Sequence, residues 1–250
     1  MDRIVYTAAG GAARVLEQQA VLSNNMANVS TTGFRAQLAN YRSVPLVAEQ
    51  GLPTRVGTVT STPGSNFEQG VMAETGSALD VAITGEGWFS VQTPNGEALT
   101  RAGELAVNPQ GLLVTQQGHP ILSAAGATIE IPDRGTVTFT SDGSITALGA
   151  GDRPNDIQML GQLKLSNPPT NTLVRGDDGL FRVEGPNAGP IQADPRVKMV
   201  SGFIEKSNVS AAETMVGLIK NARQFEMQMK VIQDASTNAE RANSILSSNG

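Results

Sequence analysis

The segment Asn24–Arg35, "NNMANVSTTGFR", decides how the chain is organised, because a long helical pattern ends there in a group of small polar residues. From Val5 to Val29, small or apolar residues recur at alternating steps of three and four, which is the spacing of a heptad seam. Gly33 is the residue best suited to take the left-handed position that caps a helix end. The segment therefore predicts that an N-terminal helix stops here and that a different kind of structure follows.

A second heptad seam lies at the other end of the chain, starting at Met215. Both seams contain small or polar members that bury little apolar surface, so a pair made of these two helices alone should be marginally stable. Small residues also allow further helices to approach closely, so an intramolecular helix hairpin and assembly with other copies are both open. The proposed assembly positions are Val15, Leu22, Met26, Val29, Met215, Leu218, Ala222, Phe225, Met229 and Ile232. We expect Leu218, Phe225, Met229 and Ile232 to contribute most of the burial between the helices, opposite Val15 and Leu22.

Between the two seams the sequence has the pattern of antiparallel β structure. Gly and Pro interrupt it every few residues, and the segments between them alternate as strands do. The dipeptides Asn95-Gly96, Asp142-Gly143 and Asp178-Gly179 are typical of tight hairpin turns. Short strands are predicted at Trp88–Gln92, Leu112–Gln116, Thr128–Ile131, Thr136–Thr140, Ile145–Leu148, Gln162–Leu165 and Leu180–Val183.

These patterns predict an α+β fold with long N- and C-terminal helices. The helices are expected to pair as a coiled-coil-like stem, since chain termini often lie close in space and two seams of similar period are natural partners. The predicted segments are an N-terminal stem helix at 1–35, an extended connector at 36–75, an inserted antiparallel β domain at 76–198 and a C-terminal stem helix at 199–250. The irregular, Pro- and Gly-containing connector has room for one hairpin.

Composition and charge exclude several classes of function. The chain has 250 residues, of which 39% are hydrophobic and 4% aromatic, so a single compact core would be thin and a segmented protein is favoured. The formal net charge is −5, with an acidic middle and no dense Lys/Arg stripe at either end, which argues against nucleic-acid binding. There is no cysteine, no window apolar enough for a membrane span, and no secretory-signal pattern in the first residues.

Enzyme chemistry has little support in the residues. His119 is the only histidine and lies beside Pro120 in a predicted turn. Asp177-Asp178 lacks the alternating ligand series of a calcium loop, and Gly85-Glu86-Gly87 lacks the third glycine of a dinucleotide loop. We expect no catalytic, cofactor-binding or metal site and no small-molecule substrate. An extracellular β-rich binding or adhesin module is the competing class, but it gives no reason for heptads at both ends.

Four separated stretches resemble flagellar basal-body rod and hook proteins, in the family's order. "NNMANVSTTGFR" resembles the signature Asn-Leu-Ala-Asn-x-x-Thr-x-Gly-Phe-Lys, with Met26 for Leu and Arg35 for Lys. The segments 79–91, 99–122 and 201–233 are similar to three further family segments; Leu99 stands where Tyr is usual and Trp88 where Phe is common. The matched residues are Asn25, Ala27, Asn28, Thr31, Gly33, Phe34, Asp80, Val81, Ala82, Ile83, Gly85, Gly87, Glu205, Ser207, Asn208 and Val209.

The resemblance implies a structural subunit that polymerises through its terminal helices into the periplasm-spanning rod that transmits torque. It implies export through the flagellar type III apparatus without a cleaved signal. The implied partners are other copies, other rod subunits, the export apparatus, and the base and surrounding rings of the basal body. The length, the short connector and Gly87-Trp88 favour a subunit of the proximal rod, and the distal rod subunit of the same family is the alternative.

Overall fold

A computed structural model of the chain describes residues 2–39, 41–46, 55–60, 64–132, 136–148, 157–185 and 189–248. The chain divides into two units that are interleaved along the sequence. The helical unit contains residues 1–29, 36–66 and 209–250, and the β unit contains residues 30–35 and 67–208. The unit boundaries differ from the segment boundaries expected from the sequence. Residues 30–35, 67–75 and 199–208, which were expected in the stem helices or the connector, belong to the β unit.

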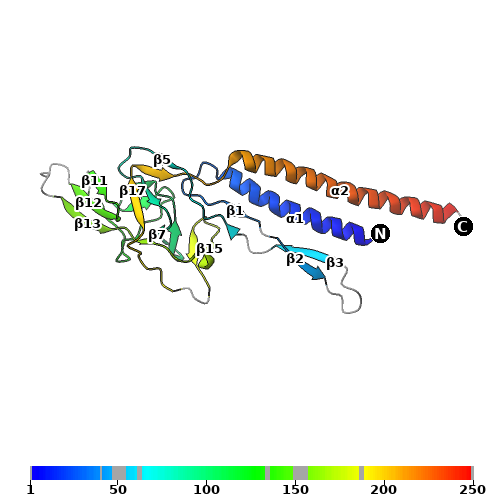
Figure 1. Cartoon of the computed structure of the whole chain (residues 1–250), viewed down its shortest axis with the longest axis horizontal. Coiled ribbons are helices and arrows are strands. Elements are labelled where there is room, and N and C mark those ends of the chain that lie inside the picture. The colour runs from blue at the N-terminus through cyan, green and yellow to red at the C-terminus, as the bar shows by residue number, and fades with distance from the viewer. Residues whose placement is uncertain are drawn as a thin grey trace. The chain divides into compact units, whose positions relative to one another are not determined.

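Two helices form most of the helical unit and lie side by side (Figure 1): α1 (Asp2–Ala27) and α2 (Ala211–Ser248). With 26 and 38 residues they are about 39 Å and about 57 Å long at the α-helical rise. They run antiparallel, since Leu22 faces Gly217 while Gly11 faces Gln228. The α+β class is therefore confirmed, with a long helix near each end of the chain.

Helix α1 ends at Ala27 without the predicted glycine cap. The backbone N–H of Asn28 donates to the carbonyl of Asn24 at 3.2 Å, and the Asn28 side-chain amide donates to the same oxygen at 2.8 Å. Gly33 has the expected positive φ of +69°, but it lies well beyond the helix end and within the β unit. The capping prediction was wrong because the positive φ serves a close backbone approach elsewhere.

The connector contributes two short antiparallel pairs to the helical unit. Strand β2 (Tyr41–Leu46) pairs with β3 (Arg55–Thr60), and β1 (Gln37–Leu38) pairs with β4 (Gly64–Ser65). The β2–β3 pair is the single hairpin for which the connector has room; its loop lies outside the described residues.

The β unit is built from short strands, and every described strand pair in it is antiparallel. Its largest sheet has the order β14-β7-β8-β16-β15, and a second has the order β11-β12-β13. Two-stranded pairs are β10-β9, β17-β6 and β18-β5. The strands are β5 (Met72–Glu74), β6 (Val81–Thr84), β7 (Trp88–Thr93), β8 (Gly96–Thr100), β9 (Leu105–Val107), β10 (Leu113–Thr115), β11 (Thr136–Phe139), β12 (Ser144–Leu148), β13 (Gln158–Gln162), β14 (Leu165–Ser166), β15 (Leu173–Arg175), β16 (Phe181–Val183), β17 (Lys198–Ser201) and β18 (Phe203–Glu205), with a 3₁₀ turn at Thr170–Thr172.

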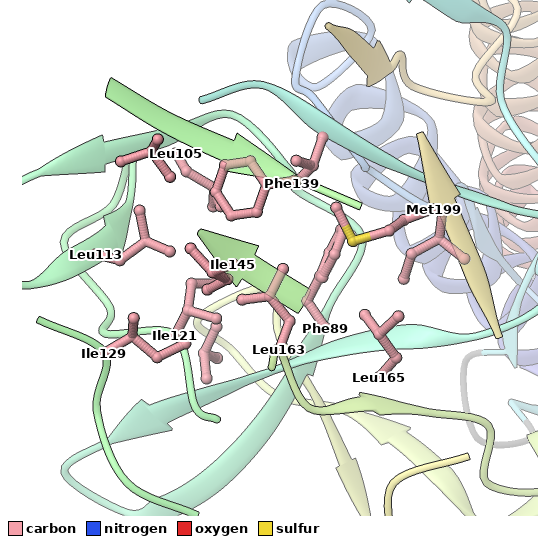
Figure 2. Close-up of a cluster of buried hydrophobic side chains, with 14 of the residues drawn as sticks. Phe89, Leu105, Leu113, Ile121, Ile129, Phe139, Ile145, Leu163, Leu165 and Met199 are labelled. Carbon is pink, nitrogen blue, oxygen red and sulfur yellow. The ribbon is translucent and has the colours of Figure 1, made fainter. Parts of the chain in front are cut away.

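Apolar side chains from several of these sheets meet in one buried core (Figure 2). Alternation along the strands directs every second side chain inward, as in β12, where Ile145 and Ala147 are buried. The labelled members of the core are Phe89, Leu105, Leu113, Ile121, Ile129, Phe139, Ile145, Leu163, Leu165 and Met199. This core belongs entirely to the β unit, which therefore has its own hydrophobic interior.

The hairpin predictions are confirmed, whereas two strand predictions were wrong. Gly96, Gly143 and Gly179 all have positive φ and connect paired antiparallel strands. Thr128–Ile131 forms only isolated bridges, to Leu122 and Leu112. The predicted strand Gln162–Leu165 is divided, because the chain passes there from the sheet of β13 to the sheet of β14 and changes neighbours.

The Asp142 carboxylate holds the β11–β12 turn and gives it a pH dependence. It accepts hydrogen bonds from the Thr140 hydroxyl and from the backbone N–H and hydroxyl of Ser144, and these bonds lower its pKa from 3.8 to about 2. A lowered folded pKa gives stability that is present above the unfolded pKa and lost as the pH falls toward 2. We expect Asp142→Asn to have a lower Tm than the unsubstituted chain at pH 6. The difference should shrink between pH 4 and pH 2, and a gap that stays constant over that range would contradict this role.

Candidate assembly helices and the junction cluster

The predicted seam of α1 faces the interior of the helical unit. Val15 is buried, while Leu22, Met26 and Val29 are partly buried. Leu22 lies against Gly217 of α2: a Cβ placed on Gly217 would be 3.2 Å from its side chain. Small residues at this line let the two helix backbones come close. Whether the same residues act in assembly stays a prediction.

The buried line of α2 differs from the predicted seam. Leu218, Phe225 and Ile232 are partly buried, but Met215, Ala222 and Met229 are exposed. The expectation that Met229 helps to fill the space between the helices was wrong. Among the α2 residues whose burial the structure describes, the buried ones are instead Thr214, Asn221 and Ala235.

A polar side chain, Asn221, contributes to the choice of the buried face of α2. The Asn221 side-chain amide donates to the backbone carbonyl of Val15 at 2.8 Å and to the Gln19 side chain at 2.9 Å. The Thr214 hydroxyl donates to the Ser210 carbonyl at 2.8 Å. The Asn221 side-chain nitrogen and the Thr214 hydroxyl have partners, which lowers the cost of burying them, whereas the Asn221 Oδ1 is buried without a partner. A search for apolar periodicity passes over such polar residues.

Large apolar side chains are exposed along both helices. On α2 the exposed set defines what we name the α2 surface: Met215, Val216, Ile219, Met227, Met229 and Val231. On α1, Ile4, Tyr6 and Leu16 are exposed. Several large apolar side chains exposed on one helix are a candidate interaction surface.

The asparagines of the N-terminal motif shape the exit from α1. Asn25 is 7% exposed and makes paired hydrogen bonds with the backbone of Gln37, donating to its carbonyl at 2.9 Å and accepting from its N–H at 2.8 Å. These bonds attach β1 to the last turn of α1. Within the same motif Ala27 is exposed, and Asn28 and Thr31 are partly buried.

The motif at residues 80–87 builds the edge of the β-unit core. Val81, Ala82 and Ile83 are buried in β6, which pairs with β17. Gly87 has φ +133°, and a Cβ on it would lie 2.5 Å from the Val197 side chain. Asp80 is partly buried, its carbonyl accepting from the Gly202 N–H at 2.7 Å, while Gly85 is exposed.

Three charged side chains meet inside the β unit, and we name Arg35, Arg101 and Glu205 the junction cluster. The Glu205 carboxylate is fully buried, with one oxygen 2.5 Å from Arg35 Nη1 and the other 3.1 Å from Arg101 Nη1. The Gly70 N–H donates to the same carboxylate at 2.9 Å. Both guanidinium groups lie over the Trp88 ring, at 5.9 Å for Arg35 and 5.6 Å for Arg101.

Burial dominates the electrostatics of the junction cluster. Desolvation lowers the pKa of Arg35, and it lowers the pKa of Arg101 to about 10, while the nearby Glu205 raises both. Arginine keeps its charge in proteins, so the cluster places two guanidinium groups around one carboxylate. The Nε atoms of both arginines and Nη2 of Arg35 are buried without a hydrogen-bond partner. Such an arrangement is costly compared with apolar packing.

The first and last family motifs come together around this cluster. The Gly33 N–H donates to the backbone carbonyl of Glu205 at 2.7 Å, and the Asn208 N–H donates to the Phe34 carbonyl at 3.3 Å. The Arg175 guanidinium lies 4.2 Å from the centre of the Phe34 ring. Ser207 and Val209 are partly buried. These contacts explain part of the residue choice in both motifs. Neither motif on its own indicates that the two segments meet.

Sequence reasoning named Glu205 only as a motif residue and did not assign Arg101 at all. The signal in the sequence was one charged residue inside each of three motifs. These charges could form ion pairs if the three motifs lay together in the fold.

Among the residues that the structure describes, no group of His, Asp and Glu could hold a metal ion. Within the same residues, no helix is long and apolar enough to cross a membrane.

Comparisons with known proteins agree with these motifs. Three family models match: flagella basal body rod protein at residues 5–35, flagellar hook protein FlgE/F/G D1 domain at 82–147, and flagellar basal body rod FlgEFG protein C-terminal at 200–245. The chain is 46% identical to flagellar basal-body rod protein FlgF of Escherichia coli and 44% identical to that of Salmonella typhimurium, each over 99% of both chains. It is 33% identical to flagellar basal-body rod protein FlgG of Agrobacterium fabrum over 92% of both chains. The chain therefore belongs to the flagellar basal-body rod protein family, as one of its FlgF-like members.

Proposed function

We propose that the chain is a structural subunit of the proximal segment of the flagellar basal-body rod. The observation that carries this proposal is the similarity to FlgF over 99% of both chains, which includes the terminal helices as well as the β unit. The lower identity to FlgG makes a distal rod subunit the weaker alternative. An adhesin or other extracellular binding module is not favoured, because that function gives no reason for long heptad helices at both ends of the chain.

Assembly through the helices follows from what they leave uncovered. Helices α1 and α2 pack antiparallel in a coiled-coil-like stem through a line that contains Ala8, Ala12 and Asn221, which bury little apolar area. The α2 surface stays exposed beside this line. Helices of other copies and of related rod subunits would cover it, so the stem gains most of its stability in the rod.

The rest of the proposal follows from the family. The function is mechanical and needs no catalytic residue, cofactor, nucleic acid or small-molecule substrate. The subunit is exported through the flagellar type III apparatus without a cleaved signal and is placed in the periplasm-spanning rod. There its partners are copies of itself, other rod subunits, and the base and surrounding rings of the basal body. Val15, Leu22, Phe225 and Ile232 are the proposed stem contacts.

A replacement experiment tests this function. The chain, with an epitope tag in the exposed Ala124-Ala125-Gly126 turn, replaces FlgF in a bacterium that lacks its own copy. We expect the tagged chain in purified basal bodies and restored swimming. Recovery of the chain only as a soluble monomer, with no rods and no swimming, would contradict the proposal and agree with a separate binding module.

A further inference from the structure

The chain crosses between the helical unit and the β unit four times, after residues 29, 35, 66 and 208. Any force that passes along the chain from one unit to the other must pass through these crossings. Three of the β-unit residues at or beside the crossings are Arg35, Glu68 and Asn208. Their hydrogen bonds show whether the crossings are independent.

They are not independent, because one carbonyl joins all three. The Glu68 carbonyl oxygen accepts from Arg35 Nη1 at 2.6 Å and from the Asn208 side-chain amide at 2.9 Å. Arg175 Nη1 donates to the Arg35 carbonyl at 2.6 Å, which holds the backbone at its crossing. The crossings after residues 35, 66 and 208 therefore start from a single hydrogen-bonded group of the β unit.

The junction cluster connects this group to the sheets. Glu205 binds the Arg35 side chain through its carboxylate and the Gly33 N–H through its backbone carbonyl. On the other side Arg101 donates to the Ile83 carbonyl of β6 at 3.3 Å and to the carbonyl of Gly85, directly after β6. A continuous set of charged hydrogen bonds thus runs from the crossings into β6.

The chemistry of the junction cluster is better suited to fixing the position of the connected segments than to stabilising the fold. Burial of two arginines with one glutamate leaves a net charge and several N–H groups without partners, whereas apolar side chains of similar volume pack at least as stably. Ionic hydrogen bonds have narrow geometry, and the planar guanidinium fork fixes orientation as well as distance. Such bonds specify where the connected segments lie.

We propose that the junction cluster is the anchor that holds the chain crossings after residues 35, 66 and 208 in place on the β unit, with Arg35, Arg101 and Glu205 as positioning residues. This inference rests on the proposed function for its purpose, which is to pass load between the units of a subunit in the rod. In the free subunit, the crossings are held on the β unit before assembly, whatever the state of the terminal helices.

Amide hydrogen exchange on the full-length free subunit tests the anchor. The reporting amides are those of Gly33, Lys206 and Asn208, bonded to the carbonyls of Glu205, Val71 and Phe34. In the unsubstituted chain we expect them to exchange as slowly as Ser90 and Leu122 of the β-unit core. Glu205→Gln removes the charge between the two arginines, so the three reporters should exchange about 100-fold faster. Ser90 and Leu122 should change less than about threefold.

Two further variants make the test selective. Glu97→Gln is the matched control, since it breaks another glutamate ion pair of the β unit, that with Lys164, and should leave the three reporters unchanged. Arg101→Lys keeps the charge but loses the fork, and should raise reporter exchange about tenfold. It decides the matter if Glu205→Gln does not fold.

The inference is overturned if the reporters exchange freely in the unsubstituted chain. It is equally overturned if Glu205→Gln speeds exchange evenly through the core, since Glu205 would then be an ordinary buried residue. Incorporation into basal bodies is scored separately with the same variants. If the unsubstituted chain is absent from the rods, the proposed function is contradicted but the hydrogen-exchange result on the free subunit is unaffected. Failure of the proposed function and failure of the anchor are therefore distinguishable.

Discussion

Gly33→Ala is expected to destabilise the β unit by about 2 to 5 kcal/mol. Gly33 has φ +69°, where a residue with a Cβ costs roughly 1 to 2 kcal/mol. A Cβ at this position would also lie 2.3 Å from the carbonyl carbon of Arg101 and 2.3 Å from the backbone nitrogen of Ala102. Backbone atoms cannot rotate away as a side chain can, so the segment 30–35 must shift and strain its bond to Glu205. Overpacking of this kind typically costs about 1 to 3 kcal/mol.

Urea unfolding followed by Trp88 fluorescence measures this loss, since Trp88 is the only tryptophan and lies in the β unit beside the junction cluster. Gly118→Ala and Gly126→Ala are matched controls. Both glycines have positive φ, at +85° and +80°, and a Cβ on either meets no atom within 4 Å. They should therefore lose only the conformational part, roughly 1 to 2 kcal/mol. If all three variants lost the same stability, the close approach at Gly33 would have no energetic role.

The elements that could be predicted from the sequence are those with local causes. A heptad spacing needs only neighbouring turns of one helix, and both long helices were found from it. The dipeptides Asn95-Gly96 and Asp142-Gly143 supply positive φ within a single turn, and the hairpins are where they indicate. Thr128–Ile131 alternates as a strand does but lacks a continuous partner, a property that depends on residues far away in the chain.

The parts that sequence reasoning missed depend on long-range polar contacts. Arg101 and Glu205 are 104 positions apart, and no pattern in either segment shows that their side chains meet. Asn221 reads as a surface residue until its partners Val15 and Gln19 are known. Gly33 shows a third case: its positive φ was correctly expected, but a helix cap was the nearest local explanation and the true cause lies at Arg101 and Ala102. Family motifs mark such positions without giving the contact that requires them.

Leu22→Asp or Phe225→Asp is expected to stop rod formation while the β unit stays folded. Both side chains are partly buried in the helical unit, and Leu22 packs against Gly217 of α2. Each substitution loses part of the about 1.5 to 3 kcal/mol that a fully buried apolar side chain of this size contributes. A carboxylate placed between helices adds several kcal/mol more unless it finds a partner. A stem with so many small residues has little stability to lose, so either change should exceed what neighbouring helices can restore.

The measurement is the amount of variant subunit in purified basal bodies, compared with the amount exported. Gln224→Asp is the matched control, because it adds the same charge at an exposed position beside Phe225 and should leave rods intact. Deletion of residues 215–250 sets the limit of full loss. The Trp88 unfolding curve should be unchanged in both point variants, since the β-unit core contains no helix residue. Intact rods that contain Leu22→Asp or Phe225→Asp subunits would show that assembly does not depend on these helix contacts.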